Sequence, residues 1–134
     1  MNAHALRTEA VLRRLVEYGP CGSVSAHIGL STSLAYAASK AGLLSLARTL
    51  SGELYPRGIR VNGLSPGPTL TPTTGKLGDT PQAQAAMLES IRQLVPVGRL
   101  GTAEEIAAAV FLASDESSFM YGSEMLVSGG GGNL

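Results

Sequence analysis

Tyr36 and Lys40 are the residues of this 134-residue chain whose types and spacing most directly suggest chemistry. They are four positions apart in an alanine-rich segment that favours a helix, so both side chains would project from one helix face. An ammonium group beside a tyrosine hydroxyl stabilises the phenolate, and such a tyrosine can exchange a proton with an alcohol or carbonyl oxygen near neutral pH. Ser23, 13 residues before Tyr36, can hydrogen-bond the same oxygen. The set suits carbonyl reduction or alcohol oxidation, for which a nicotinamide would have to supply or accept the hydride.

The same tyrosine and lysine also fit a plainer interpretation. This pair occurs often on solvent-exposed helix faces, and spacing alone favours that reading over an active site. The surrounding residues reverse the preference. Residues 36–50 read Tyr-Ala-Ala-Ser-Lys followed by Ala-Gly-Leu-Leu-Ser-Leu-Ala-Arg-Thr-Leu, and they resemble the active-site helix of the short-chain dehydrogenase/reductase (SDR) family.

The resemblance to the SDR family continues along the chain. Residues 57–67 (RGIRVNGLSPG) are similar to the family's sixth strand and to the Pro-Gly turn that follows it. Residues 96–106 and 112–122 are similar to its late helices and the loop that connects them. The similarity covers residues 23–134 in the family's order and with its spacing.

This resemblance implies a role for each matching residue. Tyr36 would be the acid/base, Lys40 would assist it and hold the nicotinamide ribose, and Ser23 would bind the reacting oxygen. The backbone of Thr69 and the hydroxyl of Thr71 match positions that contact the nicotinamide carboxamide. The implied cofactor is NAD or NADP, the substrate is a small carbonyl compound or alcohol, and the loop from about 70 to 95 would be the substrate lid. The implied cofactor-binding residues are Tyr36, Lys40, Pro66, Gly67, Thr69 and Thr71.

The chain departs from the family pattern in its first part. It has no glycine-rich phosphate turn after a strand, because the Gly129–Gly132 run has no helix behind it. Residues 20–22 stand where the family's fifth strand is expected, and Ser128 stands where an aspartate is usual. We therefore expect residues 1–22 to be an atypical segment with a shortened connection into Ser23. Residues 23–134 would be the C-terminal half of an SDR domain, a truncated oxidoreductase that need not be active on its own.

The elements that must position these residues follow from local patterns. Helices are predicted where apolar residues recur at helical spacing, and strands where β-branched and polar residues alternate. Proline at the start of one segment and a Thr-x-x-Glu capping box at another mark two helix starts. Together they predict an α/β fold, a partial Rossmann-like domain with few parallel strands and flanking helices. The predicted elements are helices over 5–17, 34–54, 81–94 and 102–113, strands over 59–64 and 124–127, and a long loop over 65–80.

Charge and composition limit the classes of partner that the chain can bind. Ten Lys and Arg residues balance ten Asp and Glu residues, which argues against nucleic acid or an anionic membrane as a partner. No apolar run approaches the roughly 20 residues that span a bilayer, and the first ten residues carry no secretion signal. The single cysteine, Cys21, excludes an internal disulfide, and no Cys/His cluster has metal-ligand spacing. We expect a cytoplasmic protein without a metal, and a homo-oligomer or a chain that pairs with a relative.

A different class of function stays open. The segment includes the helices through which SDR enzymes oligomerise, so the chain could be a non-catalytic interaction module or an unstable remnant with an exposed sheet edge. Cofactor binding separates these alternatives from an oxidoreductase. His27 lies near the implied site, but no carboxylate has a recognisable spacing to it, which favours a loop histidine over a general base.

Overall fold

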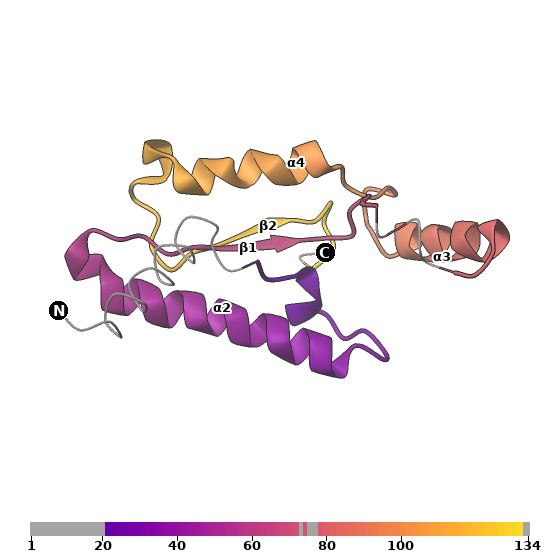
Figure 1. Ribbon diagram of the computed structural model, residues 1–134, viewed down its shortest axis with the longest axis horizontal. Coiled ribbons are helices and arrows are strands. Elements are labelled where there is room, and N and C mark those ends of the chain that lie inside the picture. The colour runs from indigo at the N-terminus through magenta and orange to yellow at the C-terminus, as the bar shows by residue number, and fades with distance from the viewer. Residues whose placement is uncertain (1–20, 73, 75–77, 133–134) are drawn as a thin grey trace.

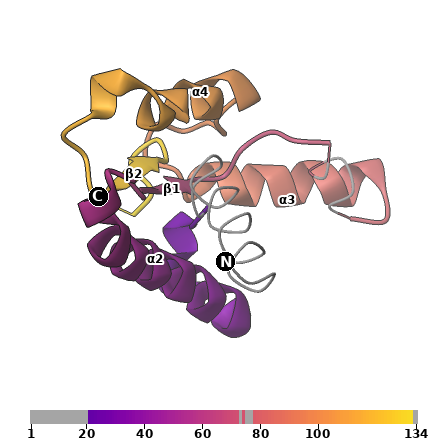
Figure 2. The same ribbon diagram turned by 60° about the vertical axis from the view of Figure 1, so that its left-hand side comes forward.

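A small parallel sheet between two helical layers organises the molecule. The computed structural model describes residues 21–72, 74 and 78–132, so the helix expected over residues 5–17 lies outside the described residues. Strand β1 (Gly63–Pro66) pairs in parallel with β2 (Glu124–Val127). Helix α2 (Leu34–Leu54) covers one face of this sheet and α4 (Ala103–Ala107) the other (Figure 1), and the turned view separates the same three layers (Figure 2). The predicted α/β class, with few parallel strands and flanking helices, is confirmed.

The described residues just before Ser23 contact the sheet through a single bridge and form no strand of their own. Cys21 forms a parallel bridge with Leu64, and the Gly22 amide donates a hydrogen bond to the Leu64 carbonyl at 2.7 Å. The sequence of residues 20–22 has no run of apolar side chains that would predict this pairing. The pairing depends on the missing side chain of Gly22, because a Cβ there would lie 2.4 Å from Ser65 Oγ.

The strand expected over 59–64 begins and ends later than predicted. β-branched Val61 is buried in the core as its type suggests, yet its carbonyl accepts from the Gly122 amide in the loop before β2. Asn62 replaces ladder bonds with side-chain bonds, donating to the Met120 carbonyl and accepting from the Ser123 amide, both at 3.0 Å. The ladder starts only at Gly63, opposite Glu124, and ends at Pro66, where a missing N–H is tolerated at a strand end.

Helix α2 forms where it was predicted and supplies the core. Its 21 residues contain no proline, and its only glycines fall on the exposed side. Leu44, Ala47 and Leu54 are buried from one stripe of the helix, and the last two pack with Val61. Proline at position 56 and a left-handed Gly58 (φ 70°) then end the helical stretch.

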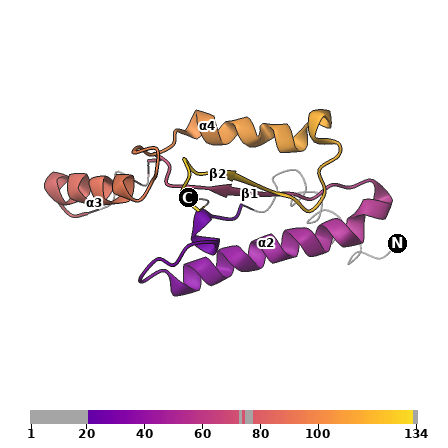
Figure 3. The ribbon, with the colours of Figure 1, turned by 180° about the vertical axis from the view of Figure 1, so that it is seen from behind.

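The later helices differ in how they pack. Helix α3 (Pro81–Gln93) begins with Thr80 as its cap and Pro81 in its first turn, as predicted, but it buries none of its residues. It lies beyond the carboxyl end of β1 (Figure 3). Helix α4 opens with the predicted capping box between Thr102 and Glu105, and stays α-helical only to Ala107. The helix expected to Ala113 continues as a 3₁₀ helix, η4 (Ala108–Ala113).

Arg60 ties the sheet to the α4 layer. Its guanidinium donates to the carbonyls of Leu112, Ser114 and Ser117 and to the Ser117 hydroxyl, at 2.7–3.1 Å. These acceptors lie at the end of η4 and in the short 3₁₀ helix η5 (Asp115–Ser117). One cation thereby adds a charged donor to three carbonyls that also accept from Ser117 or Met120.

Candidate active site

A cavity of about 380 Å³ opens at the carboxyl end of β1, which is where open α/β sheets place their ligands. We call it the Tyr36 cavity. Its lining combines four parts of the chain: the segment before η1 (Val24–Ala26), the first turns of α2, the stretch that leaves β1, and α4. Every residue to which the SDR resemblance assigns a role lines it, namely Ser23, Tyr36, Lys40, Pro66, Gly67, Thr69 and Thr71.

Tyr36 and Lys40 occupy the first two turns of α2, so the helix places them on one face as their spacing predicts. The Tyr36 side chain is half open to solvent at 51% exposure. The Lys40 ammonium lies 5.6 Å from the centre of the Tyr36 ring, within the range of a cation–π contact. The same ammonium donates a hydrogen bond to the Cys21 carbonyl at 2.9 Å, which fixes it against the sheet edge.

Ser23 faces the cavity from a turn with little freedom. Its backbone is extended (φ −168°, ψ 151°), and only 8% of the residue is exposed. The hydroxyl accepts from the Ser25 amide at 3.2 Å and donates to the Ser25 hydroxyl at 3.2 Å. Ser23 therefore caps η1, and the direction of its hydroxyl is tied to the orientation of that short helix.

The opposite wall is the stretch that follows β1. The Thr69 hydroxyl donates to the Gly67 carbonyl at 2.9 Å, which folds this stretch back on itself. The amide of Leu70 donates to the Gly101 carbonyl, and the Gly101 amide donates to the Pro68 carbonyl, both at 2.9 Å. Two backbone bonds thus hold the threonine wall against the start of α4.

Four lining residues had no assigned role in the sequence, namely Cys21, Gly22, Ala103 and Ile106. Ala103 and Ile106 of α4 close the cavity beside the threonine wall. The capping box predicted the start of α4, but nothing local shows that Gly101 pairs with the 68–70 stretch. The pairing is a long-range contact that holds the start of α4 beside the site.

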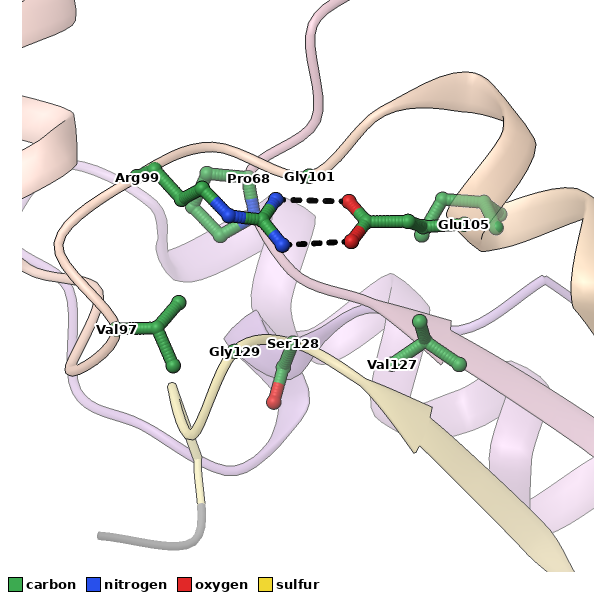
Figure 4. Close-up of a pocket in the computed structure, with 9 residues that line it drawn as sticks. Pro68, Val97, Arg99, Gly101, Glu105, Val127, Ser128 and Gly129 are labelled. Atoms are coloured by element: carbon green, nitrogen blue, oxygen red, sulfur yellow. Dashed lines mark hydrogen bonds and ion pairs between the residues drawn. The ribbon is translucent and has the colours of Figure 1, made fainter.

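A smaller cavity of about 90 Å³ lies next to the Tyr36 cavity, and Ile106 lines both. Figure 4 shows Arg99 and Glu105 facing each other at its rim, joined by contacts of 2.9 and 2.6 Å. The Arg99 guanidinium is the main reason that the pKa of Glu105 falls from 4.5 to about 2, and the Thr102 amide adds to the effect. This carboxylate is therefore ionised throughout the physiological range.

The structure corrects the expectation that His27 lacks a carboxylate partner. Its Nε2 lies 2.7 Å from Glu124 Oε1, across 97 residues of chain. A separation of this length leaves no sequence signal. His27 is not among the residues that line the Tyr36 cavity, so its interpretation as a general base gains no support.

Among residues 21–72, 74 and 78–132, no three His, Cys, Asp or Glu side chains gather closely enough to hold a metal ion. In that same part of the chain, no helix has the length and apolarity needed to cross a membrane.

The chain is similar to known proteins over most of its length. A family profile described as enoyl-(acyl carrier protein) reductase matches residues 15–131. The chain is 37% identical over 131 residues to D-threitol dehydrogenase of Mycolicibacterium smegmatis, covering 93% of this chain and 48% of that protein. It is 44% identical over 110 residues to the 3-oxoacyl-(acyl-carrier-protein) reductase FabG of Salmonella typhimurium, covering 81% and 43%.

A solved structure of a short chain dehydrogenase/reductase family protein superposes with a TM-score of 0.72 at 41% identity. The superposition covers 85% of this chain and 44% of that one. The chain belongs to the short-chain dehydrogenase/reductase family, as the motifs around Tyr36 predicted. It spans less than half the length of the two curated relatives named above.

Proposed function

We propose that this chain contributes the reacting half of an NAD(P)-dependent oxidoreductase that interconverts a carbonyl compound and a secondary alcohol. One observation carries the proposal. Ser23, Tyr36 and Lys40 come from separate segments of sequence or successive helical turns, and all three line the same cavity. Surface placement of the tyrosine and lysine, the plainer interpretation of their spacing, does not account for a serine and a threonine wall in the same lining.

The proposed chemistry divides among the three side chains. In the direction of reduction, Tyr36 donates its hydroxyl proton to the carbonyl oxygen as the carbonyl carbon receives a hydride. The Lys40 ammonium stabilises the phenolate that remains, and it is held near the ring by the Cys21 carbonyl. The Ser23 hydroxyl orients the substrate oxygen by turning its proton from the Ser25 hydroxyl toward that oxygen, which accepts the hydrogen bond. In the direction of oxidation, the Tyr36 phenolate accepts the hydroxyl proton of the alcohol as the carbon gives up a hydride.

The residues of the cavity fit the nicotinamide end of such a cofactor. Lys40 offers an ammonium donor for ribose hydroxyls, and the Thr69 backbone and the Thr71 hydroxyl stand at the carboxamide position assigned by the resemblance. The volume of about 380 Å³ falls within the range of small-molecule sites. A bound NAD or NADP would supply or accept the hydride; the protein contributes orientation and proton transfer.

The substrate class follows from this chemistry. One relative is named for D-threitol, an alcohol, and another for a 3-oxoacyl group, which contains a carbonyl. We propose a small-molecule carbonyl or secondary alcohol substrate for this chain as well. The stretch from about 70 to 95, which includes the outlying α3, would cover it.

A second candidate is a pairing role, with a second copy or a related chain as partner. The observation that favours it is the exposure of large apolar side chains, since Phe119 is fully exposed and Leu34 and Val110 are largely so. Such side chains in numbers commonly mark an interface. Light scattering on the purified chain measures this directly, and a monomer at all concentrations would contradict a pairing between copies.

Calorimetric titration of the folded chain with NADH and NADPH tests the oxidoreductase proposal. We expect one of them to bind with micromolar affinity, and a carbonyl screen with the preferred cofactor then to show turnover. Alkylation of Cys21, the single thiol and a lining residue, should slow when the cofactor is present. Lys40→Met serves as the matched variant, because it removes the ammonium but keeps the length of the side chain. A folded wild-type chain that binds neither cofactor would overturn the proposal for this chain on its own.

A further inference from the structure

The side chains of His27 and Glu124 connect two regions that are far apart in sequence. Their contact of 2.7 Å joins the residue that ends η1 to the residue that begins β2. Both side chains are partly covered, at 32% and 17% exposure. A pair at this depth is screened less by water than a pair on the open surface.

Helix η1 connects the His27–Glu124 pair to Ser23 of the proposed site. Ser23 caps its first turn through the Ser25 amide, and the His27 amide donates to the Val24 carbonyl at 2.9 Å to close the other end. Only three residues separate Ser23 from His27. A displacement at His27 is therefore passed to the Ser23 hydroxyl with little chain to absorb it.

Two other supports hold η1 to the sheet. At its start, the Gly22 amide beside Ser23 donates to the Leu64 carbonyl of β1, and the second support acts on the middle of η1. Val24 is buried, and its side chain and that of Leu126 of β2 both lie within 3.6 Å of the position that a Cβ on Gly132 would occupy. This apolar contact resists lifting of the turn from the sheet, but it gives no directional bond against rotation. The His27–Glu124 contact supplies that bond at the end opposite to the Ser23 cap.

The anchor of the pair lies on the same sheet as the opposite wall of the cavity. Glu124 stands beside Gly63 at the start of the β1–β2 ladder, and the ladder ends where Pro66 stands beside Val127. Pro66 and Gly67 then enter the Tyr36 cavity. The β1–β2 sheet thereby supports both the serine side and the threonine side of the cavity.

We propose that His27 and Glu124 form a positioning pair that holds the Ser23 turn in register with the sheet and so orients the Ser23 hydroxyl. The inference rests on the proposed function for its chemical consequence, although its structural part does not. His27 acts through η1 and touches neither substrate nor cofactor. Neither residue was assigned a role by its sequence.

The structural part is tested by hydrogen exchange of the Ser25 amide in the full chain, followed by NMR. His27→Ala and Glu124→Ala should each raise the exchange rate about tenfold, because the bond to Ser23 opens more often. The double variant should exchange as fast as either single variant, to within about twofold, since both remove one contact. His27→Gln, which keeps a donor, should recover most of the protection.

The chemical part is tested by carbonyl reduction in the same variants. We expect kcat to fall about tenfold in both alanine variants, with the KM for the nicotinamide cofactor unchanged and with recovery in His27→Gln. Glu116→Gln, a change at an exposed carboxylate outside the cavity lining, is the matched control and should leave all values as in the wild type.

Two results would overturn the positioning role. Unchanged Ser25 exchange in both alanine variants would show that the pair does not hold the turn. Raised exchange with an unchanged kcat would show that the turn does not need to be held for the reaction. A wild-type chain without turnover would instead refute the proposed function, and the exchange measurement would still decide the structural part. Unfolding midpoints of all variants separate a local opening from a loss of the fold.

Discussion

Arg99 and Glu105 form a two-pronged ion pair that also completes a helix cap. The guanidinium reaches both carboxylate oxygens, at 2.9 and 2.6 Å, and one of these oxygens accepts from the Thr102 amide at 2.9 Å. The same carboxylate therefore begins α4 and anchors the loop in front of it. Because Ala103 and Ile106 of α4 line the Tyr36 cavity, this pair sets the position of one of its walls.

Glu105→Gln should flatten the acid limb of the stability curve. The Arg99 guanidinium, and then the Thr102 amide, lower the pKa of Glu105 from 4.5 to about 2 in the folded chain. A depressed folded-state pKa stabilises the fold fully above the unfolded value and loses this effect as pH falls through the folded value. Urea unfolding should therefore show a wild-type advantage that is complete above about pH 5 and fades toward pH 2.

The control for this measurement is Glu89→Gln on α3. Glu89 also pairs with an arginine, Arg92, at 2.7 Å, but it closes no helix cap and touches no wall of the cavity. Its effect on the curve should be the smaller of the two. Wild-type and Glu105→Gln curves that run parallel from pH 7 to pH 2 would refute the assigned role. Added salt should reduce the difference, since the pair is exposed.

Arg60→Ala should be the most damaging single change among the exposed or half-buried arginines of the described segment. It removes four hydrogen bonds from a charged donor and leaves carbonyls of Leu112, Ser114 and Ser117 without that partner. We expect a loss of about 2–3 kcal/mol in the free energy of unfolding, measured in urea. Arg48→Ala, on the exposed side of α2, should change it by less than about 0.5 kcal/mol. Equal effects of the two changes would contradict the role of Arg60 in joining the sheet to the α4 layer.

Gly22→Ala should destabilise the chain, and Ser65→Ala should partly restore it. The new Cβ would lie 2.4 Å from Ser65 Oγ and 2.8 Å from a methyl group of Leu44, which we expect to cost about 2 kcal/mol. Ser65 Oγ is also a fully buried hydroxyl for which the described residues offer no hydrogen-bond partner. Ser65→Ala alone should therefore be neutral or slightly stabilising.

The double variant decides this prediction. Thermal unfolding of Gly22→Ala/Ser65→Ala should recover about half of the loss, because the Leu44 contact remains. Strictly additive effects would mean that the two positions do not meet as described.

Tyr36→Phe should separate binding from chemistry. It keeps the ring beside Lys40 but removes the hydroxyl that transfers the proton, so kcat should fall by about 10³-fold. The affinity for NADH or NADPH should change by less than about threefold, as measured by calorimetry. A variant that retains more than a tenth of the wild-type kcat would show that another group transfers the proton.

Local signals in the sequence located most of the elements. The α2 stripe of Leu44, Ala47 and Leu54, Pro81 in the first turn of α3, and the capping box of α4 each act within one or two helical turns. Their physical causes are short-ranged, so they can be recognised without the rest of the fold. The boundaries of β1 could not be predicted this way, because a ladder begins where a partner strand stands, and Glu124 is far along the chain.

The candidate site divides in the same manner. Tyr36 and Lys40 are four residues apart on α2, and family resemblance supplied Ser23 and the threonine wall. The pairing of Gly101 with the 68–70 stretch and the contact of His27 with Glu124 depend on tertiary packing alone. Sequence motifs therefore predicted which groups meet, and the structure adds the supports that hold them.

The register that sets Gly63 beside Glu124 also has a consequence for the order of events during synthesis. About sixty residues separate the two strands, so β1 leaves the ribosome long before its partner does. Until β2 emerges, one edge of β1 is open, and η1 lacks its carboxylate anchor, Glu124. Contacts between such distant segments form slowly, and their open edges attract other chains. Nascent chains should therefore depend on chaperones most strongly in the interval between the emergence of these two strands.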